Sequence, residues 1–401
     1  MQQTTDSVLQ IGPDVRDLIA LVRAGQNEKA LLSLLVIPGR FVGKLLALAD
    51  CAPTKVKGGI RILADRLWSK EQRKARGFLV DAEDEATARD LLAFYYLGSP
   101  QSWLYNHFTC LFAQPRHLAG LSLASLFPAS GKPILDLACG FGHYMHYWCT
   151  RDPEQRVIGV DRNYFQLYVA KKRIAPNGDF ICSEADDKLP FVSRRFSGVF
   201  CSDAFHYFLG RWQSVEEMKR LVEAGGSIVL SRFGNRRVEP REGYELTVDG
   251  YLRLFDGIPT RMVSEEVLLQ AYLKKSGPPF DEQPAKTHLA SQKWLYLLAS
   301  ENRALFRDHP EFETWPHASG RLRLNPLYHE IHKDPEGNIT VEFQFPSKWY
   351  EFENSACTQY MPATALVSKE VLDAIASGTW SEDLESLIRH CVIVGMPERY
   401  Y

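Results

Sequence analysis

The sequence predicts a doubly wound α/β fold with a mostly parallel sheet, a helical region before it and a small α+β part after it. Short apolar runs alternate with helix-like stretches at intervals of about 20–25 residues, which is typical of strands in a parallel sheet covered on both faces. The first run enters a glycine turn, and the sequence pattern changes on both sides of the alternating region. We therefore expect three domains: a helical region at 1–80, the sheet domain at 81–300 and an α+β domain at 301–401.

Apolar runs bounded by turn residues mark the expected strands of the sheet. Five such runs occupy 133–138, 156–161, 179–182, 197–202 and 226–231. The stretches between them that have helical spacing are 142–150, 164–173 and 212–223. Beyond residue 236, we expect a helix at 248–255, a helix opened by Ser264-Glu265-Glu266 and an apolar strand at 294–298 that could finish the same sheet.

The flanking regions follow other patterns. Apolar residues recur at helical spacing between about 14 and 68. Near the C-terminus, 321–331 and 338–345 alternate like the two arms of a hairpin around Asp334-Pro335-Glu336-Gly337. Helices are expected after it at 369–375 and 381–389.

Composition narrows the class of protein. The formal net charge of the 401 residues is −2, so the chain lacks the electrostatic footprint of a protein that wraps nucleic acid. Its eight cysteines are scattered rather than spaced as in a disulfide scaffold, which fits a reducing compartment. The first six residues do not resemble a signal peptide, and no apolar stretch is long enough to span a bilayer. We expect a cytoplasmic protein with neither a membrane nor a nucleic-acid partner.

The strongest chemical signal is Ile134-Leu135-Asp136-Leu137-Ala138-Cys139-Gly140-Phe141-Gly142. A buried strand ends in a turn whose glycines allow the backbone to approach a ligand, and a helix begins directly afterwards. The next strand ends at Asp161, about 20 residues later, where a carboxylate can accept hydrogen bonds from both hydroxyls of a ribose. This spacing also suits a dinucleotide fold, so geometry alone does not identify the ligand that carries the ribose.

In this region the sequence resembles the class I S-adenosylmethionine-dependent methyltransferases, over roughly residues 90–300. Segment 136–142 is similar to the first motif of that family, and Val160-Asp161-Arg162-Asn163 to its second. Segments 184–191 and 196–206 are similar to the stretch after its third strand and to its fourth strand with the strand's end. Together these motifs favour S-adenosylmethionine over a dinucleotide.

The resemblance implies a set of cofactor contacts. Asp136 is expected near the ammonium group of the methionine moiety, which the backbone of 138–142 passes beneath. Asp161 is expected on the ribose hydroxyls, and Ser202 and Asp203 are expected to face the methyl group. The complete set of expected cofactor-binding residues is Asp136, Ala138, Gly140, Gly142, Asp161, Arg162, Glu184, Ala185, Asp186, Ser202 and Asp203.

The sequence departs from the family pattern at two places. Ala138 replaces the usual first glycine, which is tolerable if this residue keeps a negative φ. The acidic residue after the third strand is either Glu184 or Asp186, so the adenine contact, made together with Ala185, is open between the two.

Few residues are candidates for catalysis or metal binding. His206 lies just beyond the fourth expected strand, where an open α/β sheet places its ligands, and it is the candidate general base. A histidine packed at a strand–helix junction would look the same in sequence. His143, His146 and Cys149 recur every three residues, but without a fourth ligand they make a poor metal site, and we expect no metal.

We expect methyl transfer to a small-molecule acceptor, for instance in specialised metabolism. One alternative is a peptide-modifying methyltransferase or a peptide-binding module, because residues 320–400 faintly resemble small winged-helix domains that bind peptides. The other is a dinucleotide-dependent oxidoreductase. It is disfavoured because the third glycine of its fingerprint would fall at Met145.

Overall fold

The computed structural model describes residues 86–95, 103–127, 131–185, 187–238, 245–309 and 319–401. The helices predicted before residue 80 lie outside these ranges. The chain forms two compact units. The described parts of the first unit are 86–95, 103–109, 346–350 and Tyr401, and those of the second come from 110–345 and 351–400. The domain boundaries at 80/81 and 300/301 stay predictions.

Two short helices form most of the described part of the first unit, α6 (Ala88–Tyr95) and α7 (Trp103–Thr109). Arg89 joins them, because its Nε donates a hydrogen bond to the Tyr105 hydroxyl at 2.8 Å. The C-terminal residue belongs to the same unit: the Tyr401 hydroxyl donates to the carbonyl of Thr109, and the Arg89 guanidinium lies over the Tyr401 ring. A guanidinium over an aromatic face is an attractive arrangement.

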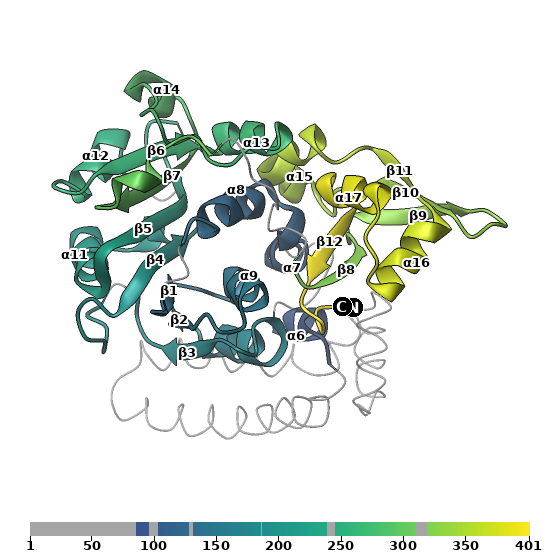
Figure 1. The fold of residues 1–401 in the computed structure, drawn as a ribbon, viewed down its shortest axis with the longest axis horizontal. Helices are drawn as coiled ribbons and strands as arrows, with labels where there is room; N and C mark the ends of the chain where they lie inside the picture. Colours follow the sequence, from purple (N-terminus) through teal and green to yellow (C-terminus); the bar gives the residue numbers. More distant parts are fainter. Residues whose placement is uncertain (1–85, 96–102, 128–130, 186, 239–244, 310–318) are drawn as a thin grey trace, which may run out of the picture. The chain divides into compact units, whose positions relative to one another are not determined.

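The second unit is built on a seven-stranded sheet with the strand order β3-β2-β1-β4-β5-β7-β6 (Figure 1). The strands are β1 (Ile134–Leu137), β2 (Val157–Asp161), β3 (Asp179–Cys182), β4 (Phe196–Ser202), β5 (Val222–Gly234), β6 (Thr260–Ser264) and β7 (Trp294–Ser300). β1 to β5 pair in parallel, and β7 runs antiparallel to both β5 and β6. The five predicted parallel strands and the strand near 294 are therefore confirmed.

The strand order reverses at β1, because β2 and β3 lie on one side of it and β4 follows on the other. At such a reversal the loops leaving adjacent strands diverge, which opens a crevice beyond the carboxyl ends. The carboxyl ends of β1, β2 and β4 are thus where this fold places a ligand.

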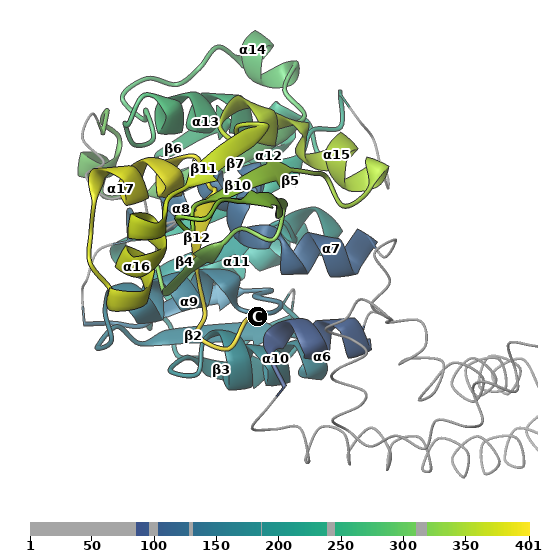
Figure 2. The same ribbon diagram turned by 90° about the vertical axis from the view of Figure 1, so that its right-hand side faces the viewer.

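Helices cover both faces of the sheet (Figures 1 and 2). One core cluster packs β1, β4 and β5 against α11 (Arg211–Leu221) and α12 (Val248–Leu254). The other packs the opposite face against α8 (Pro115–Ala124), α9 (His143–Arg151) and α13 (Glu265–Leu273). Because neighbouring residues of one strand enter opposite clusters, the strands are continuous apolar runs, as the sequence showed.

The remaining helices of the second unit are short. Tyr164–Val169 forms α10, which continues into a π-helical turn at Ala170–Ile174. The others are α14 (Lys286–Ala290), α15 (Lys348–Asn354, shared with the first unit), α16 (Lys369–Ser377) and α17 (Glu382–Arg389), with 3₁₀ turns at Leu111–Ala113, Phe205–Tyr207, Arg303–Leu305 and Ser355–Gln359. No helix within the described residues is long and apolar enough to cross a bilayer.

The C-terminal strands form two further sheets. β9 (Tyr328–Lys333), β10 (Ile339–Phe343) and β11 (Thr364–Val367) form one, and β8 (Arg321–Leu324) pairs with β12 (Ile393–Met396) in the other. The hairpin around Asp334–Gly337 and the two helices after it are confirmed.

The expectation that 321–331 forms a single hairpin arm is wrong. The Asn325 carbonyl accepts from the backbone N–H of Tyr328, and its side chain accepts from that of Leu327. This turn separates β8 from β9. β8 then pairs with β12 in the two-stranded sheet, whereas β9 pairs with β10. The pattern also missed β6, whose five residues precede the α13 helix, because the helix signal at Ser264 dominated this stretch.

Candidate cofactor site and adjoining charged cluster

The glycine turn leads from β1 to α9 as predicted. Gly140 and Gly142 have φ values of +53° and +71°, in the left-handed region that residues with a side chain rarely adopt. Gly142 directly precedes α9, and a Cβ there would lie 3.3 Å from the Cβ of Ala170. A Cβ on Gly140 would make only an ordinary contact, 3.7 Å from Oε1 of Gln166, so its positive φ rather than crowding favours glycine there.

Ala138 does not keep the negative φ that the sequence analysis required of it. Its φ is +58°, although it carries a Cβ. A left-handed conformation costs a residue other than glycine about 1–2 kcal/mol. The turn therefore carries strain next to the expected ligand, and strain of this kind is concentrated at functional sites.

Asp161 ends β2 and organises the turn. One of its carboxylate oxygens accepts a hydrogen bond from the backbone N–H of Gly140 at 2.9 Å, and the other accepts from that of Asn163 at 2.8 Å. A carboxylate oxygen has lone pairs for a second hydrogen bond. Asp161 can thus hold the turn and still accept hydrogen bonds from ribose hydroxyls.

Asp136 is a buried acid with no cationic partner among the described residues. Its side chain is almost completely buried, and its Oδ2 has no hydrogen-bond partner among the described residues. Burial, and then the nearby charge of Asp161, raise its pKa well above the usual range for aspartate. A cationic ligand group beside Asp136 would remove this cost, so the site fits the ammonium of an amino-acid moiety.

Close packing beneath the turn depends on a strand glycine. A Cβ on Gly159 of β2 would lie 2.4 Å from the sulfur of Met145 and 2.8 Å from that of Cys139. In the dinucleotide fingerprint, a glycine on the helix provides this close approach. Here the helix carries the large Met145 and the strand carries the glycine.

The residues expected near adenine follow β3. Ala185 is buried, whereas Glu184 and Arg162 are exposed and face one another at 4.0 Å. Asp186 lies outside the described residues. The choice between Glu184 and Asp186 therefore stays open.

Beyond the end of β4, Asp203 has a different environment from the one expected. Its φ is +51°, and its two carboxylate oxygens bind Arg116 of α8 at 2.6 Å and Arg232 of β5 at 3.1 Å. Ser202, the last residue of β4, is partly buried. Asp203 lies at the expected edge, but it faces two guanidinium groups.

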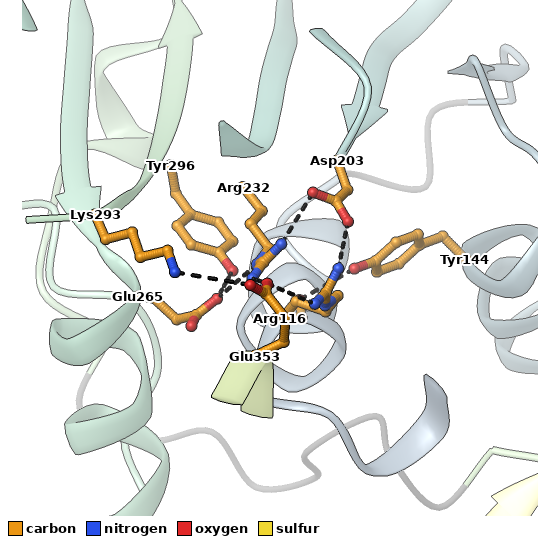
Figure 3. Close-up of polar contacts among 8 residues, drawn as sticks. All are labelled: Arg116, Tyr144, Asp203, Arg232, Glu265, Lys293, Tyr296 and Glu353. Atoms are coloured by element: carbon orange, nitrogen blue, oxygen red, sulfur yellow. Dashed lines mark hydrogen bonds and ion pairs between the residues drawn. The ribbon is translucent and has the colours of Figure 1, made fainter. Parts of the chain in front are cut away.

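These contacts belong to a charged cluster at the carboxyl ends of β4, β5 and β6 and at the start of β7 (Figure 3). Its members are Arg116, Asp203, Arg232, Glu265, Lys293 and Glu353. Tyr296 donates a hydrogen bond to Glu265 at 2.7 Å. Three cations and three carboxylates are present, so the charges of the cluster balance.

Arg232 is the centre of this charged cluster. Its side chain is 2% exposed and reaches Asp203, Glu265 at 3.3 Å and Glu353 at 3.5 Å. Burial lowers its pKa, but the surrounding carboxylates outweigh this and raise the pKa above the ordinary arginine value. Its φ is +51°, at an irregularity in the pairing of β5 with β7. Glu353, equally buried, comes from α15 in the C-terminal part of the chain.

His206 lies on the 3₁₀ turn three residues beyond Asp203. It is 9% exposed, and its Nδ1 has no hydrogen-bond partner among the described residues. Burial lowers its pKa, and although Asp203 opposes this effect the net shift remains downward. The imidazole is therefore neutral at pH 7, as a proton acceptor must be.

The two histidines of α9 have partners of other kinds. His143 Nε2 lies 2.9 Å from the Tyr400 hydroxyl, and His146 Nε2 lies 3.2 Å from the carbonyl of Ser319. No group of three or more potential metal ligands occurs in the described parts of the chain.

Sequence reasoning missed the charged cluster. Arg116, Arg232 and Glu353 come from segments far apart in the sequence, and no motif surrounds them. The one available signal was a basic or acidic residue inside an apolar context, as at Arg232 between Leu230 and Phe233.

The comparisons with known proteins agree with the geometry. Residues 134–226 match the family model described as a methyltransferase domain. Two curated relatives are a demethylmenaquinone methyltransferase of Clavibacter sepedonicus and a tRNA (guanine-N(7)-)-methyltransferase of Rubrobacter xylanophilus. The first is 27% identical and the match covers 39% of this chain; the second is 31% identical over 20% of this chain. The chain spans 62% of the first relative's length and 39% of the second's.

A solved S-adenosylmethionine-dependent methyltransferase of Aquifex aeolicus is 14% identical, with a TM-score of 0.34; the match covers 49% of this chain and 97% of that one. The family model spans β1 to the middle of β5, which includes the glycine turn, Asp161 and the end of β4. This chain therefore contains a class I S-adenosylmethionine-dependent methyltransferase domain, and the cofactor of that family is S-adenosylmethionine.

Proposed function

We propose that this protein transfers a methyl group from S-adenosylmethionine to a small-molecule acceptor bound beyond the carboxyl end of β4. The observation that carries the proposal is the buried Asp136 carboxylate, whose Oδ2 has no hydrogen-bond partner among the described residues, beside a glycine turn held by Asp161. A buried acid without a cation is costly, and it is retained where a ligand supplies the cation.

The chain's residues would hold the cofactor as follows. Asp136 binds the ammonium group, Asp161 accepts from the ribose hydroxyls, and the backbone at Gly140 lies against the methionine moiety. Ala185 and either Glu184 or Asp186 hold the adenine. S-adenosylmethionine supplies a methyl carbon on a sulfonium, and displacement at that carbon requires the acceptor to be in line with the breaking bond, so positioning does most of the work.

His206 is the proposed general base. Its neutral imidazole has an Nδ1 without a partner among the described residues, and it lies directly after the strand end that faces the reaction. If the acceptor is a hydroxyl or an acidic carbon, Nδ1 accepts its proton as the new bond to the methyl carbon forms. An acceptor that is already anionic, or an amine that is neutral once bound, needs no base.

A small acceptor is favoured over a nucleic acid. The relatives' names differ in acceptor, a quinone in one and a tRNA in the other, so the comparisons leave the acceptor open. The net charge of −2 and the balanced charges of the cluster beside the site give a polyanion no attraction.

Calorimetry on the full chain tests the proposal. We expect binding of S-adenosylmethionine and S-adenosylhomocysteine, and weaker binding of both by Asp136→Asn, which keeps the side chain's shape but removes its charge. Incubation with S-adenosylmethionine that carries a deuterated methyl group, followed by mass spectrometry of candidate acceptors, identifies the product. Binding of NAD together with no binding of either methionine derivative would refute the assignment.

A further inference from the structure

One face of α9 carries His143 and His146, which the proposed cofactor contacts do not use. Both side chains are buried, so their polar atoms find their partners inside the protein. His143 Nε2 and the Tyr400 hydroxyl share a hydrogen bond of 2.9 Å, and His146 Nε2 donates to the carbonyl of Ser319 at 3.2 Å. These two α9 histidines therefore connect the helix after the glycine turn to the segments that flank the sheet of β8 and β12.

The contact between His143 and Tyr400 is closely packed. Tyr400 is completely buried, and the ring of Phe112 lies against both partners. The centroid of the Phe112 ring is 5.0 Å from that of Tyr400 and 5.2 Å from that of His143. Aromatic rings at such separations attract one another. The orientation of the His143 side chain is therefore set by Tyr400 and Phe112 together.

Tyr400 is in turn fixed to the two-stranded sheet. Its backbone N–H donates to the carbonyl of Pro397 at 3.1 Å, which closes a turn directly after β12. Within this turn, the Glu398 carboxylate accepts from Arg321 at 2.6 Å and the Glu398 carbonyl accepts from Arg323 at 2.8 Å. Both arginines belong to β8, so the turn that carries Tyr400 is held on that strand.

The second histidine packs just as closely. Gly320 has a φ of +95°, and a Cβ there would lie 2.7 Å from His146 Nε2 and 2.4 Å from the carbonyl oxygen of Met396. Only glycine allows the backbone to approach this near. Burial lowers the pKa of His146 to about 4, so its imidazole is neutral at pH 7 and donates its one proton to Ser319.

The α9 histidines also form the first turn of α9. His143 follows Gly142 directly, and the backbone N–H of His146 donates to the carbonyl of Gly142 at 3.0 Å. The first N–H groups of a helix have no acceptor within the helix and favour an anionic ligand group. S-adenosylmethionine carries a carboxylate beside its ammonium group. A shift of this helical turn would move these N–H groups and the glycine turn together.

We propose that Tyr400 is a positioning residue for S-adenosylmethionine. It acts through His143, holding the first turn of α9, and hence the glycine turn, in the geometry that binds the cofactor. This inference rests on the cofactor position given in the proposed function. Tyr400 lies outside the segment 134–226 that matches the family model, so cofactor affinity in this chain depends on a part of it that the family model does not include.

Calorimetry with S-adenosylhomocysteine on the full chain tests the proposal. Tyr400→Phe keeps the ring and removes the hydroxyl, and it should weaken binding by about 3- to 10-fold, as expected for one lost hydrogen bond. Tyr328→Phe is the matched control, because Tyr328 is 3% exposed and its hydroxyl donates to the carbonyl of Pro362 at 2.7 Å. This control should lose stability in urea to a similar extent but keep the wild-type affinity.

The outcomes separate this proposal from the proposed function. No binding of S-adenosylhomocysteine by the wild type would refute the proposed function itself. Wild-type binding that Tyr400→Phe leaves unchanged would overturn only the positioning role. Equal weakening by Tyr400→Phe and Tyr328→Phe would also overturn it, because the loss would then follow from reduced stability.

A double-mutant cycle tests whether Tyr400 acts through His143. His143→Leu removes Nε2 with a side chain of similar size and should weaken binding as Tyr400→Phe does. The double variant should bind no more weakly than His143→Leu alone, because both changes break the same contact. Additive weakening would show that the two residues act separately, which contradicts the proposal.

Hydrogen exchange needs only the wild type and Tyr400→Phe. In the wild type, S-adenosylhomocysteine should slow exchange in peptides that cover 134–146 and also in those that cover 393–400, whereas β10 should be unaffected. In Tyr400→Phe the protection of 393–400 should be lost, because the contact that transmits it is broken. Protection of 134–146 alone in the wild type would overturn the coupling.

Discussion

The two halves of the sheet's carboxyl edge treat buried charge in opposite ways. On the side of β1 and β2, Asp136 is buried with no cation beside it in the described part of the chain, and burial raises its pKa. On the side of β4 to β7, Arg232 is equally buried but lies within 3.5 Å of three carboxylates. In the first half, a buried carboxylate has no counter-charge among the described residues. In the second half, the positive and negative charges balance.

This difference indicates that the half with Asp136 binds a ligand and that the half with Arg232 stabilises the fold. An unpaired buried charge is tolerated where a ligand completes it, whereas a paired one stabilises the fold only as long as every partner is present. His206 lies in the half with Arg232 but shares one feature with Asp136, a buried polar atom that lacks a partner in the described structure. The predictions below test whether it belongs with the ligand-binding half.

The largest effect is expected at His206. His206→Ala should lower turnover by about 10²–10⁴-fold with cofactor affinity kept, if the acceptor must lose a proton. Because burial lowers the His206 pKa, wild-type turnover should rise with pH through that lowered pKa and be flat above about 6.5, and the variant should lack this rise. His288→Ala, at an exposed histidine of α14, is the control. Turnover near that of the wild type would remove His206 from the catalytic residues and leave the methyltransferase assignment intact.

Arg232→Met should lower the free energy of unfolding by about 3–5 kcal/mol, because it leaves buried carboxylates without their shared cation. Lys293→Met removes a cation from the same cluster, but this lysine is 28% exposed and 3.8 Å from Glu353, so its loss should cost about 1 kcal/mol or less. Urea unfolding of both variants measures the contrast. Similar losses in the two would show that burial does not distinguish these ion pairs.

Asp161→Ala should weaken S-adenosylmethionine binding by about 1–3 kcal/mol, since it removes charge-assisted hydrogen bonds to the ribose and to the turn. Asp179→Ala removes an exposed carboxylate at the start of the neighbouring strand and should leave binding unchanged. Calorimetry with both variants decides the matter. An unchanged dissociation constant in Asp161→Ala would show that Asp161 does not contact the cofactor.

Asp136→Asn should raise the stability of the ligand-free protein by about 1 kcal/mol at pH 7, because it removes an unpaired buried charge. Since the folded-state pKa of Asp136 is raised, the acid destabilises the fold as pH rises above the unfolded value of about 3.9. The stability difference between variant and wild type should therefore grow from acid toward neutral pH. A stability difference that is constant from about pH 4 to 7 would contradict the view that the Asp136 carboxylate is buried without a compensating cation.

The smallest effect is expected at Ala138. Ala138→Gly should stabilise the fold by about 0.5 kcal/mol, because relief of the left-handed strain slightly exceeds the extra flexibility that glycine gives the unfolded chain. Gly225→Ala is the reverse change at a left-handed position with free space around it, and it should destabilise by about 1 kcal/mol. Thermal unfolding of both variants measures the pair, and a destabilised Ala138→Gly would mean that the alanine methyl packs more favourably than its φ suggests.

The parts that could be predicted are those whose signal is local. The parallel strands and the Asp136–Gly142 turn lie within single short segments, and Asp161 follows at a characteristic spacing, so periodicity and turn chemistry sufficed. β6 was missed because the helix signal at Ser264 dominated its stretch, and the path of β8 was missed because the turn at Asn325 interrupts what looks like one alternating segment. The pairing of β8 with β12 joins segments about 70 residues apart, which local patterns do not encode.

The sequence by itself determined the five parallel strands, the glycine turn after the first of them and, through the motifs it shares with a known family, the class of cofactor, because each of these signals lies within a short segment of the chain. Only the tertiary structure decided that Ala138 is strained, that Asp203 faces two arginines and that Glu353 joins the charged cluster. These properties arise from burial and from distances between remote segments, and they exist only once the chain has folded.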